Sequence, residues 1–337
     1  VNFTPTDDSV YEGNETAIIA ISGVSGADAT ENGTQTVTIT ITENESAPTI
    51  TLARSAASID ENSGSTITLT ATISGVTDSA VTVALSTSGT ATEGTDYGTI
   101  SDITISAGAT TGTATLDPTD DNVYEDDETA TIDISSVSGK SGVTENSTQQ
   151  VSVTISENES APTVTLATSA TSIAENAGSS LTLTATLSNA TTADVTVALS
   201  TSGTGTEGTD FGTVSDITIS AGSTTGTASF TPTDDSIYDA TSNETAGISI
   251  SGVSGGSASE SGTQSVTITI TENESAPTVT LSRSAASINE NAGSSVTLTA
   301  TLSIKVDETV TVALSTSGAA TEGTDYTDGS GNLDDIT

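Results

Sequence analysis

The sequence predicts an all-β protein built from tandem, immunoglobulin-like antiparallel β-sandwiches. Three observations lead to this prediction. The phrase ENESAPT occurs at 43–49, 157–163 and 272–278, so a unit of about 114 residues repeats along the chain. Within each unit, apolar and polar residues alternate with the period of a strand. Gly, Asn, Asp and Ser cluster between these runs, and no segment has the period of a helix.

Three runs show the strand pattern clearly. LTLTATL at 181–187 and VTVAL at 195–199 place their aliphatic residues on one face. QSVTITITE at 264–272 does the same, with Thr on the other face. The β-branched residues that fill these runs favour a pleated, half-buried surface. About seven such strands fit into one repeat, which is the size of an immunoglobulin-like sandwich.

The repeat divides the chain into four parts. Residues 47–160 and 161–275 each form a complete repeat, whereas 1–46 match the second half of a repeat and 276–337 match the first half. The two halves add up to one domain that lacks about nine residues, a length within the ordinary range of connections. Three explanations stay open: a window on a longer array, completion of each half by the next copy, or pairing of the chain's own ends. We expect covalent continuity rather than strand exchange, and in either case a filament.

The charge of the chain restricts its partners. There are 45 acidic residues against 4 basic ones and no histidine, for a formal net charge of −41. Such a surface repels nucleic acid and anionic membranes, because phosphate binding requires Lys and Arg. No apolar run approaches the roughly 20 residues of a membrane-spanning helix. Seven carboxylates lie within 117–128 without a base among them, so we expect their counter-charge to come from solution.

Composition also argues against catalysis and sugar binding. Without His or Cys there is no imidazole base and no thiol nucleophile. Paired carboxylates would need a sugar-binding cleft, and aromatic residues make up only 2% of the chain. We therefore expect no enzymatic activity. Asn-X-Ser/Thr sequences occur, but they are frequent by chance in so Ser/Thr-rich a chain, and glycosylation stays open.

Four ordered motifs carry a resemblance to a known family. They are AENAG at 174–178, GTATEGTDY at 89–97, PTDDNVYEDDET at 118–129 and ISENE at 155–159. Together they resemble the Calx-beta domain, known from sodium-calcium exchangers, integrin subunits and large bacterial surface proteins. The resemblance implies that acidic loops at one end of each sandwich bind a cluster of calcium ions, more than one per complete repeat. Calcium takes six to eight oxygen ligands, which converging loops can supply.

The resemblance also implies which residues bind calcium, mainly carboxylates together with some backbone carbonyls. In the first complete repeat they are Glu61, Asp96, Asp120, Asp121, Glu125, Glu128, Glu157, Glu159 and the carbonyl of Val123. In the second they are Glu175, Asp210, Asp234, Asp235, Asp239, Glu244, Glu272, Glu274 and the carbonyl of Ile237. The N-terminal half has Asp7, Asp8, Val10, Glu12, Glu15, Glu43 and Glu45, and the C-terminal half has Glu290 and Asp325.

Two departures from the family limit this assignment. The last strand ends in Glu-Asn-Glu, where calcium-rich members have three aspartates, so we expect fewer ions per site. In the second repeat YDATSNE is two residues longer than YEDDE, which puts the reach of Glu244 in question. We expect Asp126 and Asp127 to face solvent.

These features predict an extracellular or cell-surface structural protein. It would be a calcium-stiffened rod or fibre of tandem repeats, as in an adhesin or a biofilm-matrix filament, whose partners are copies of itself or further repeats joined end to end. A calcium sensor or buffer, and the stalk of a larger surface enzyme or adhesin, stay open as alternatives.

Overall fold

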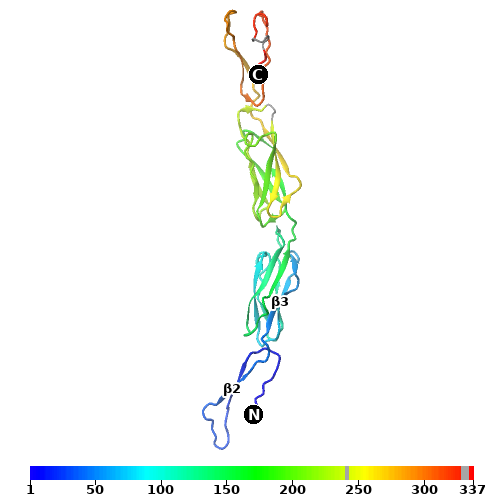
Figure 1. The fold of residues 1–337 in the computed structure, drawn as a ribbon, viewed down its shortest axis with the longest axis vertical. Coiled ribbons are helices and arrows are strands. Elements are labelled where there is room, and N and C mark those ends of the chain that lie inside the picture. The colour runs from blue at the N-terminus through cyan, green and yellow to red at the C-terminus, as the bar shows by residue number, and fades with distance from the viewer. Residues whose placement is uncertain (240–242, 328–333) are drawn as a thin grey trace. The chain divides into compact units, whose positions relative to one another are not determined.

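In the computed structural model, which describes residues 1–239, 243–327 and 334–337, the chain divides into two compact units, Val1–Ser160 and Ala161–Thr337. Each unit contains one complete β-sandwich and one smaller region with a two-stranded hairpin (Figure 1). Within the described residues no helix occurs, and hence none with the length and hydropathy of a membrane span. The predicted all-β fold of tandem immunoglobulin-like sandwiches is confirmed.

The first sandwich has two facing sheets. The five-stranded sheet has the order β4 (Ser58–Asp60), β12 (Gln150–Ser156), β10 (Glu128–Ser138), β6 (Val81–Gly89), β7 (Ile103–Ile105). The four-stranded sheet has the order β11 (Thr144–Glu145), β3 (Thr49–Arg54), β5 (Ile67–Ile73), β8 (Thr111–Leu116). Most neighbours are antiparallel, but β4 runs parallel to β12 and β11 runs parallel to β3.

The second sandwich repeats this topology. Its five-stranded sheet has the order β14 (Ser172–Ala174), β23 (Ser265–Thr271), β21 (Glu244–Ser254), β17 (Val195–Gly203), β18 (Ile217–Ile219). Its four-stranded sheet has the order β22 (Ser259–Glu260), β13 (Thr163–Thr168), β15 (Leu181–Leu187), β19 (Thr225–Phe230). Each complete sandwich therefore has nine described strands in its two sheets instead of the predicted seven. The short parallel strands account for this difference, because two or three residues are too few to show a period.

The core of each sandwich follows from the two-residue alternation. In β5, Ile67, Leu69, Ala71 and Ile73 are at most 3% exposed, and the threonines between them are half-buried or exposed. Burying an aliphatic side chain contributes roughly 1.5–3 kcal/mol, so the four positions anchor the sheet. The second core contains a ring pair, Phe211 and Phe230, whose centroids are 5.0 Å apart.

The remaining strands lie outside the sandwich sheets. β1 (Glu15–Ala20) pairs with β2 (Thr36–Ile41), and β24 (Val279–Arg283) pairs with β25 (Leu298–Leu302), each as an antiparallel hairpin. Four two-residue strands complete the set: β9 (Val123–Tyr124), β16 (Ala190–Thr191), β20 (Ile237–Tyr238) and β26 (Lys305–Val306).

Within each unit, the same loop joins the hairpin region to the sandwich. In the first unit, the Tyr11 amide donates to the Val76 carbonyl at 2.9 Å, and Tyr11 bridges to Thr77. In the second unit, β20 pairs in parallel with β26, so that Tyr238 faces Val306. Tyr11 and Tyr238 occupy the same position in the repeat. The same contact therefore forms in both units, because the residues that make it recur in the repeat.

Gly89 at the end of β6 provides a test of the close packing between β6 and β10. Its φ is +119°, and a Cβ there would lie 2.0 Å from the Thr129 carbonyl oxygen. Gly89→Ala should lower the free energy of unfolding of the first sandwich by about 2 kcal/mol or more. Calorimetric melting of the whole chain measures this. Gly94→Ala is the control, since φ there is +89° but no heavy atom lies within 4 Å. Equal losses in both variants would show that the close contact is not the cause.

Candidate metal centre

The pairing of three strands brings the predicted acidic residues of the first sandwich together. Glu128 opens β10 and pairs with Ile155 near the end of β12, so the start of one strand lies beside the end of the other. Because β4 runs parallel to β12, Asp60 faces Ser156, and the Glu61 amide donates to the Ser156 carbonyl at 3.1 Å. Glu61 and Glu157, which each follow directly after a strand, therefore come out side by side.

The aspartate of the EGTDY motif is held by its own turn. The Asp96 carboxylate accepts a hydrogen bond from the Thr92 amide at 2.5 Å, and Asp210 accepts from Thr206 at 2.6 Å. Asp325 repeats this bond with Thr321 at 2.8 Å. The turn is thus local and forms in all three copies of the motif. One carboxylate oxygen closes the turn, and the aspartate keeps a second oxygen for a ligand.

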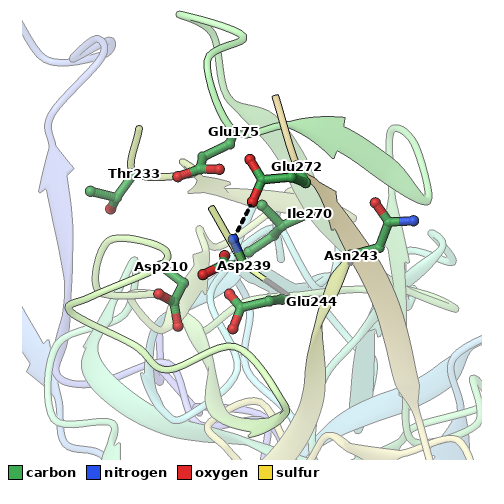
Figure 2. A pocket seen from close by; sticks show the side chains of 8 residues that line it. All are labelled: Glu175, Asp210, Thr233, Asp239, Asn243, Glu244, Ile270 and Glu272. Atoms are coloured by element: carbon green, nitrogen blue, oxygen red, sulfur yellow. Dashed lines mark hydrogen bonds between the residues drawn. The ribbon is translucent and has the colours of Figure 1, made fainter. Parts of the chain in front are cut away.

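The glutamate that opens Glu-Asn-Glu is held by backbone amides in all three copies. The Glu272 carboxylate accepts from the amides of Asp239, Asn273 and Glu274, each at 2.7 Å, and Figure 2 shows the bond from Asp239. Burial alone would raise the pKa of Glu272, but the amide donors outweigh it and hold the pKa below its ordinary value. In the N-terminal half, hydrogen bonding with Glu45 and backbone amides lowers the pKa of Glu43 to about 2.

Four other glutamates at the site are more strongly affected by desolvation than by hydrogen bonds from backbone amides. Glu61 and Glu175 are each 8% exposed, and this desolvation raises the pKa of both to about 7. Desolvation, followed by the nearby Asp96 and Asp210, also raises the pKa of Glu128 and Glu244 to about 7. A bound cation would reverse this effect, because it stabilises the ionised form.

The carboxylates converge closely enough to bind a metal ion. In the first sandwich two groups have ligand oxygens within 4.8 Å of one another, and in the second sandwich there is one such group among the described residues. The groups are Glu61 with Glu157 and Glu159, Asp96 with Glu125 and Glu128, and Glu175 with Asp239 and Glu272. Figure 2 shows Asp210, Asp239 and Glu244 close together below Glu175 and Glu272.

Unsatisfied oxygens supply a second indication of a cation. The Oε2 atoms of Glu128, Glu159 and Glu274 are buried and have no hydrogen-bond partner within the described part of the chain. Leaving a buried acceptor unpaired costs about 1–3 kcal/mol, and more if it is charged. A hard divalent cation satisfies such oxygens directly. The donor set, made only of oxygens, therefore fits calcium.

Some predicted ligands lie at the edge of these groups. The pKa values of Glu159 and Glu274 are raised mainly by hydrogen bonds with Glu157 and Glu272, and Asp120 and Asp234 add a smaller charge repulsion. Asp120 and Asp234 do not line the cavities between the carboxylates. The amides of Asp121 and Asp235 donate to Glu61 at 3.3 Å and to Glu175 at 3.1 Å.

The predicted carbonyl ligands lie in short strands. Val123 and Ile237 belong to β9 and β20, and their amides donate to Asp121 and Asp235, each at 2.6 Å. Neither residue lines a cavity between carboxylates.

Each half repeat also gathers its predicted residues. Asp7, Asp8, Val10, Glu12, Glu15, Glu43 and Glu45 all line one cavity of about 40 Å³. Glu290 and Asp325 line a different, larger cavity of about 390 Å³, whose other walls include Ile288, Leu298 and Tyr326.

Several residues near the sites were missed from the sequence. Asp126 and Asp127 are exposed, as expected, but Asp126 also lines the cavity of the first sandwich, and Asp127 accepts from the Glu157 amide at 3.0 Å. Asn243 and Thr233 line the cavity of the second. In that second site Glu244 does reach the cavity despite the longer loop, part of which (240–242) lies outside the described residues.

Two more missed residues come from the neighbouring repeat. The pKa of Glu12 is raised mainly by repulsion from Glu15, to which Asp78 adds. The pKa of Asp239 is raised mainly by desolvation, to which repulsion from Glu272 and Asp307 adds. Asp78 and Asp307 occupy the same position in the repeat, in a loop far from the acidic motifs in sequence.

One basic residue does lie beside a carboxylate cluster. Lys140 Nζ lies 2.5 Å from Asp78 Oδ1 and 2.5 Å from the Glu12 carbonyl, and 5.9 Å above the Tyr11 ring. The chain thus supplies some positive charge near the N-terminal cluster, which the sequence did not suggest. The second sandwich has Gly256 at this position, so the lysine is not a general part of the site.

The raised pKa values predict an unusual pH dependence for the cation-free protein. Glu61, Glu128, Glu175 and Glu244 ionise near 4.5 when unfolded, but in the folded chain they keep their protons up to about pH 7. Their contribution to stability is therefore fully present below about pH 4.5 and is lost as pH rises through about 7. In chelator, the melting temperature should fall between pH 5 and pH 8. Glu61→Gln with Glu175→Gln should flatten this fall, and a melting temperature that rises over the range would contradict the assignment.

Comparison with solved structures finds matches to two Calx structures and to a bacterial adhesin. The CBD12 fragment of CALX1.2 has 15% identity and a TM-score of 0.28, and the match covers 66% of this chain and 100% of that one. The apo form of the Calx CBD1 domain has 22% identity and a TM-score of 0.28, with 33% and 99% covered. The Yersinia pseudotuberculosis adhesin InvE has 14% identity and a TM-score of 0.29, with 66% and 58% covered.

Sequence comparison identifies the family. No curated protein sequence matches the chain significantly. The Calx-beta domain model, however, matches residues 43–159, 157–274 and 272–334, which together span most of the sequence. The chain therefore belongs to the Calx-beta domain family.

Proposed function

We propose that this protein is a calcium-binding structural protein of the cell surface or extracellular space, in which tandem Calx-beta sandwiches form a stiff spacer or fibre. The observation that carries the proposal is the repeated acidic end: four separate chain segments place carboxylates around the same small space in two successive sandwiches. Calx-beta domains are calcium-binding modules, and this chain keeps the oxygen donors that such a role requires.

The geometry supports two different roles for the glutamates of the site. Glu157 and Glu272 are fixed by backbone amides, so their carboxylates offer a pre-positioned anchor for the cation. Glu61 and Glu175 are desolvated and would release a proton when the ion binds. The two carboxylate groups of the first sandwich, one around Glu61 and one around Asp96, support more than one ion in that repeat.

The junctions between repeats support a stiffening role. ENESAPT connects the last ligands of one repeat to the first strand of the next with few residues between them. Proline fixes its own φ and biases the preceding residue toward extended geometry. Asp78 and Asp307 also approach the acidic cluster of the preceding repeat within their units. Without a cation these charges repel each other, and with one they would be drawn together.

Affinity separates the spacer from the alternative of a calcium sensor or buffer. Extracellular modules bind calcium near 10⁻⁴–10⁻³ M, whereas cytosolic sensors bind at about 10⁻⁷–10⁻⁵ M. The high negative charge and the absence of His and Cys from the sequence favour binding and structural roles over catalysis. A role as the stalk of a larger surface enzyme or adhesin is a variant of the same proposal.

Calorimetric titration of the whole chain tests calcium binding. Uptake should occur at near-millimolar calcium and release protons at pH 7, because a pKa of about 7 leaves a large fraction of Glu61 and Glu175 protonated until the ion binds. Glu61→Gln should weaken the first site by about 10- to 100-fold, which is about 1.4–2.7 kcal/mol. Asp102→Asn is the matched control, since Asp102 accepts from the Leu85 amide and belongs to neither carboxylate group. No uptake at millimolar calcium, or equal loss in both variants, would refute the site, and submicromolar binding would favour a sensor.

Small-angle scattering tests the stiffening. Calcium should increase the maximum dimension of the chain and narrow its distance distribution, because bound ions cancel the repulsion at the junctions. Pro162→Gly should reduce that increase by loosening one junction. Profiles that are the same in calcium and in chelator would argue against a calcium-stiffened spacer, even if calorimetry shows binding.

A further inference from the structure

Lys140 lies at the joint between the N-terminal half repeat and the first sandwich. Of the four basic residues of the chain, it makes the one ion pair found among the described residues, with Asp78. Its side chain is only 12% exposed, although a lysine ammonium is strongly hydrated in water. Burying a charge is costly unless it is paired and hydrogen-bonded, so the contacts of Lys140 must compensate for the lost water.

The ammonium of Lys140 contacts residues on both sides of this joint. Its Nζ atom lies 2.5 Å from Oδ1 of Asp78, which belongs to the same sandwich. It also donates to the Glu12 carbonyl at 2.5 Å and lies 5.9 Å from the centre of the Tyr11 ring, and these two residues belong to the preceding half repeat. Charge-assisted hydrogen bonds are stronger than neutral ones, and the aromatic face adds attraction. One lysine therefore connects two consecutive repeats.

Tyr11 is held by the same two loops that carry the ion pair. Its amide donates to the Val76 carbonyl at 2.9 Å, in the loop between β5 and β6 that contains Asp78. Its hydroxyl lies against Gly142, in the loop between β10 and β11 that contains Lys140, because a Cβ at Gly142 would lie 2.3 Å from that oxygen. The lysine thus lies beside a tyrosine that its own sandwich already positions.

Without Lys140 this joint would bring two carboxylates together. Tyr11 and Thr77 form a parallel bridge, and Glu12 and Asp78 directly follow them in sequence. The next residues of two parallel segments are neighbours, so these two carboxylates lie side by side. An ammonium beside them turns repulsion into attraction, and its hydrogen bond holds the pKa of Asp78 below the ordinary value.

The second complete repeat lacks both members of the ion pair. Thr192 stands at the position of Asp78, and Gly256 stands at that of Lys140. A Cβ at Gly256 would lie 2.7 Å from the Thr191 hydroxyl oxygen, so this loop leaves no room for a larger side chain. The two members are thus replaced together, as expected of residues that act as a unit. The pair is a property of the first sandwich and not of the repeat.

We propose that Lys140 is a resident cation that keeps the joint between the N-terminal half repeat and the first sandwich closed without calcium. It acts as a positioning residue, because its ammonium fixes Tyr11 and Glu12 against the two loops of the sandwich. This joint therefore differs from the calcium-stiffened junctions of the proposed function. It stays closed even if calcium binds nowhere in the chain.

The competing arrangement is an ion pair that stabilises the sandwich alone. An isolated surface ion pair would be too weak to hold a joint, because solvent screens it and both side chains lose freedom. Lys140 differs in that it is largely buried and has partners in both repeats at once. The two arrangements therefore predict different responses to changes in the preceding half repeat.

Distance measurement across the joint tests the proposal in the intact chain. The chain has no cysteine, so Thr40→Cys in β2 and Thr113→Cys in β8, both at exposed positions, can each carry a spin label. In chelator the distance distribution should be narrow, and Lys140→Gln should broaden it about twofold or more by letting the half repeat pivot. Lys305→Gln is the matched control, since it removes the same charge from the other compact unit.

This measurement is made without calcium, so a failure of calcium binding does not affect it. A distribution that is equally narrow in the Lys140→Gln variant would overturn the proposal. A distribution of the parent chain that is broad in chelator and narrows only in millimolar calcium would also overturn it, because a metal ion would then hold this joint.

Digestion with a lysine-specific protease gives a second readout. The chain has two lysines, Lys140 and Lys305, and the protease must take the lysine side chain into its own pocket. Asp78→Asn should therefore speed cleavage after Lys140 about 10-fold, which is about 1.4 kcal/mol, relative to cleavage after Lys305 in the same digest. Asp133→Asn is the matched control, since Asp133 accepts from Gln150 elsewhere in the sandwich. Equal acceleration in both variants would indicate a loosened sandwich and contradict the proposal.

A variant of the preceding half repeat separates a joint from an ion pair that acts within the sandwich. Tyr11→Ala leaves Lys140 and Asp78 in place, yet it should speed cleavage after Lys140 about threefold or more, because the ammonium loses the aromatic ring. Tyr238→Ala is the control, since it removes the equivalent tyrosine of the second unit and should leave cleavage after Lys140 unchanged. If cleavage after Lys140 does not respond to Tyr11→Ala, the pair acts within the sandwich alone and the proposal fails.

Discussion

The ladder between β6 and β10, repeated as β17 and β21, is the interaction on which the rest of each repeat depends. It joins the two halves of the repeat at the middle of the five-stranded sheet, and a buried residue such as Ile132 lies directly on it. The same strand β10 opens with Glu128, so one element both covers the core and supplies a carboxylate to the acidic end. Hydrophobic burial and convergence of charge are therefore not separate in this fold: a repeat that loses the ladder loses both.

The acidic end shows how two opposite electrostatic states are built from one residue type. Despite its burial, three backbone amides hold the pKa of Glu272 below its ordinary value, whereas desolvation raises the pKa of the nearby Glu175 to about 7. In the absence of a cation, a protonated Glu175 lowers the negative charge of the site. When a cation binds, Glu272 already carries its charge, and only the desolvated Glu175 has to lose a proton. Protonation of the desolvated glutamates therefore reduces the repulsion among the five carboxylates that line this cavity.

Much of the fold could be predicted from the sequence, but the details of the site could not. The alternation in LTLTATL and the repetition of ENESAPT depend on local pattern, and they identified strands such as β15 and the tandem organisation correctly. The parallel pairing of β4 with β12 was not predictable, since three residues do not show a period. The burial of Glu61 follows from that pairing and was missed with it. Asp307 was missed because it reaches the site from the neighbouring repeat, and no motif within its own repeat indicates that contact.

The identical sequence of β6 and β17 has a consequence for folding. A nascent chain holds interchangeable copies of one central strand, so β10 can pair with the wrong copy at no cost in backbone hydrogen bonding. Such exchange between neighbours is a characteristic failure of repeat proteins. The cores differ where the strands do not: the first sandwich combines Tyr97 with Leu116, and the second combines Phe211 with Phe230. A swapped sandwich would set Tyr97 against Phe230 or Phe211 against Leu116, which overfills one core and leaves space in the other. The different large side chains at a few buried positions therefore favour pairing of each half of a repeat with its own partner.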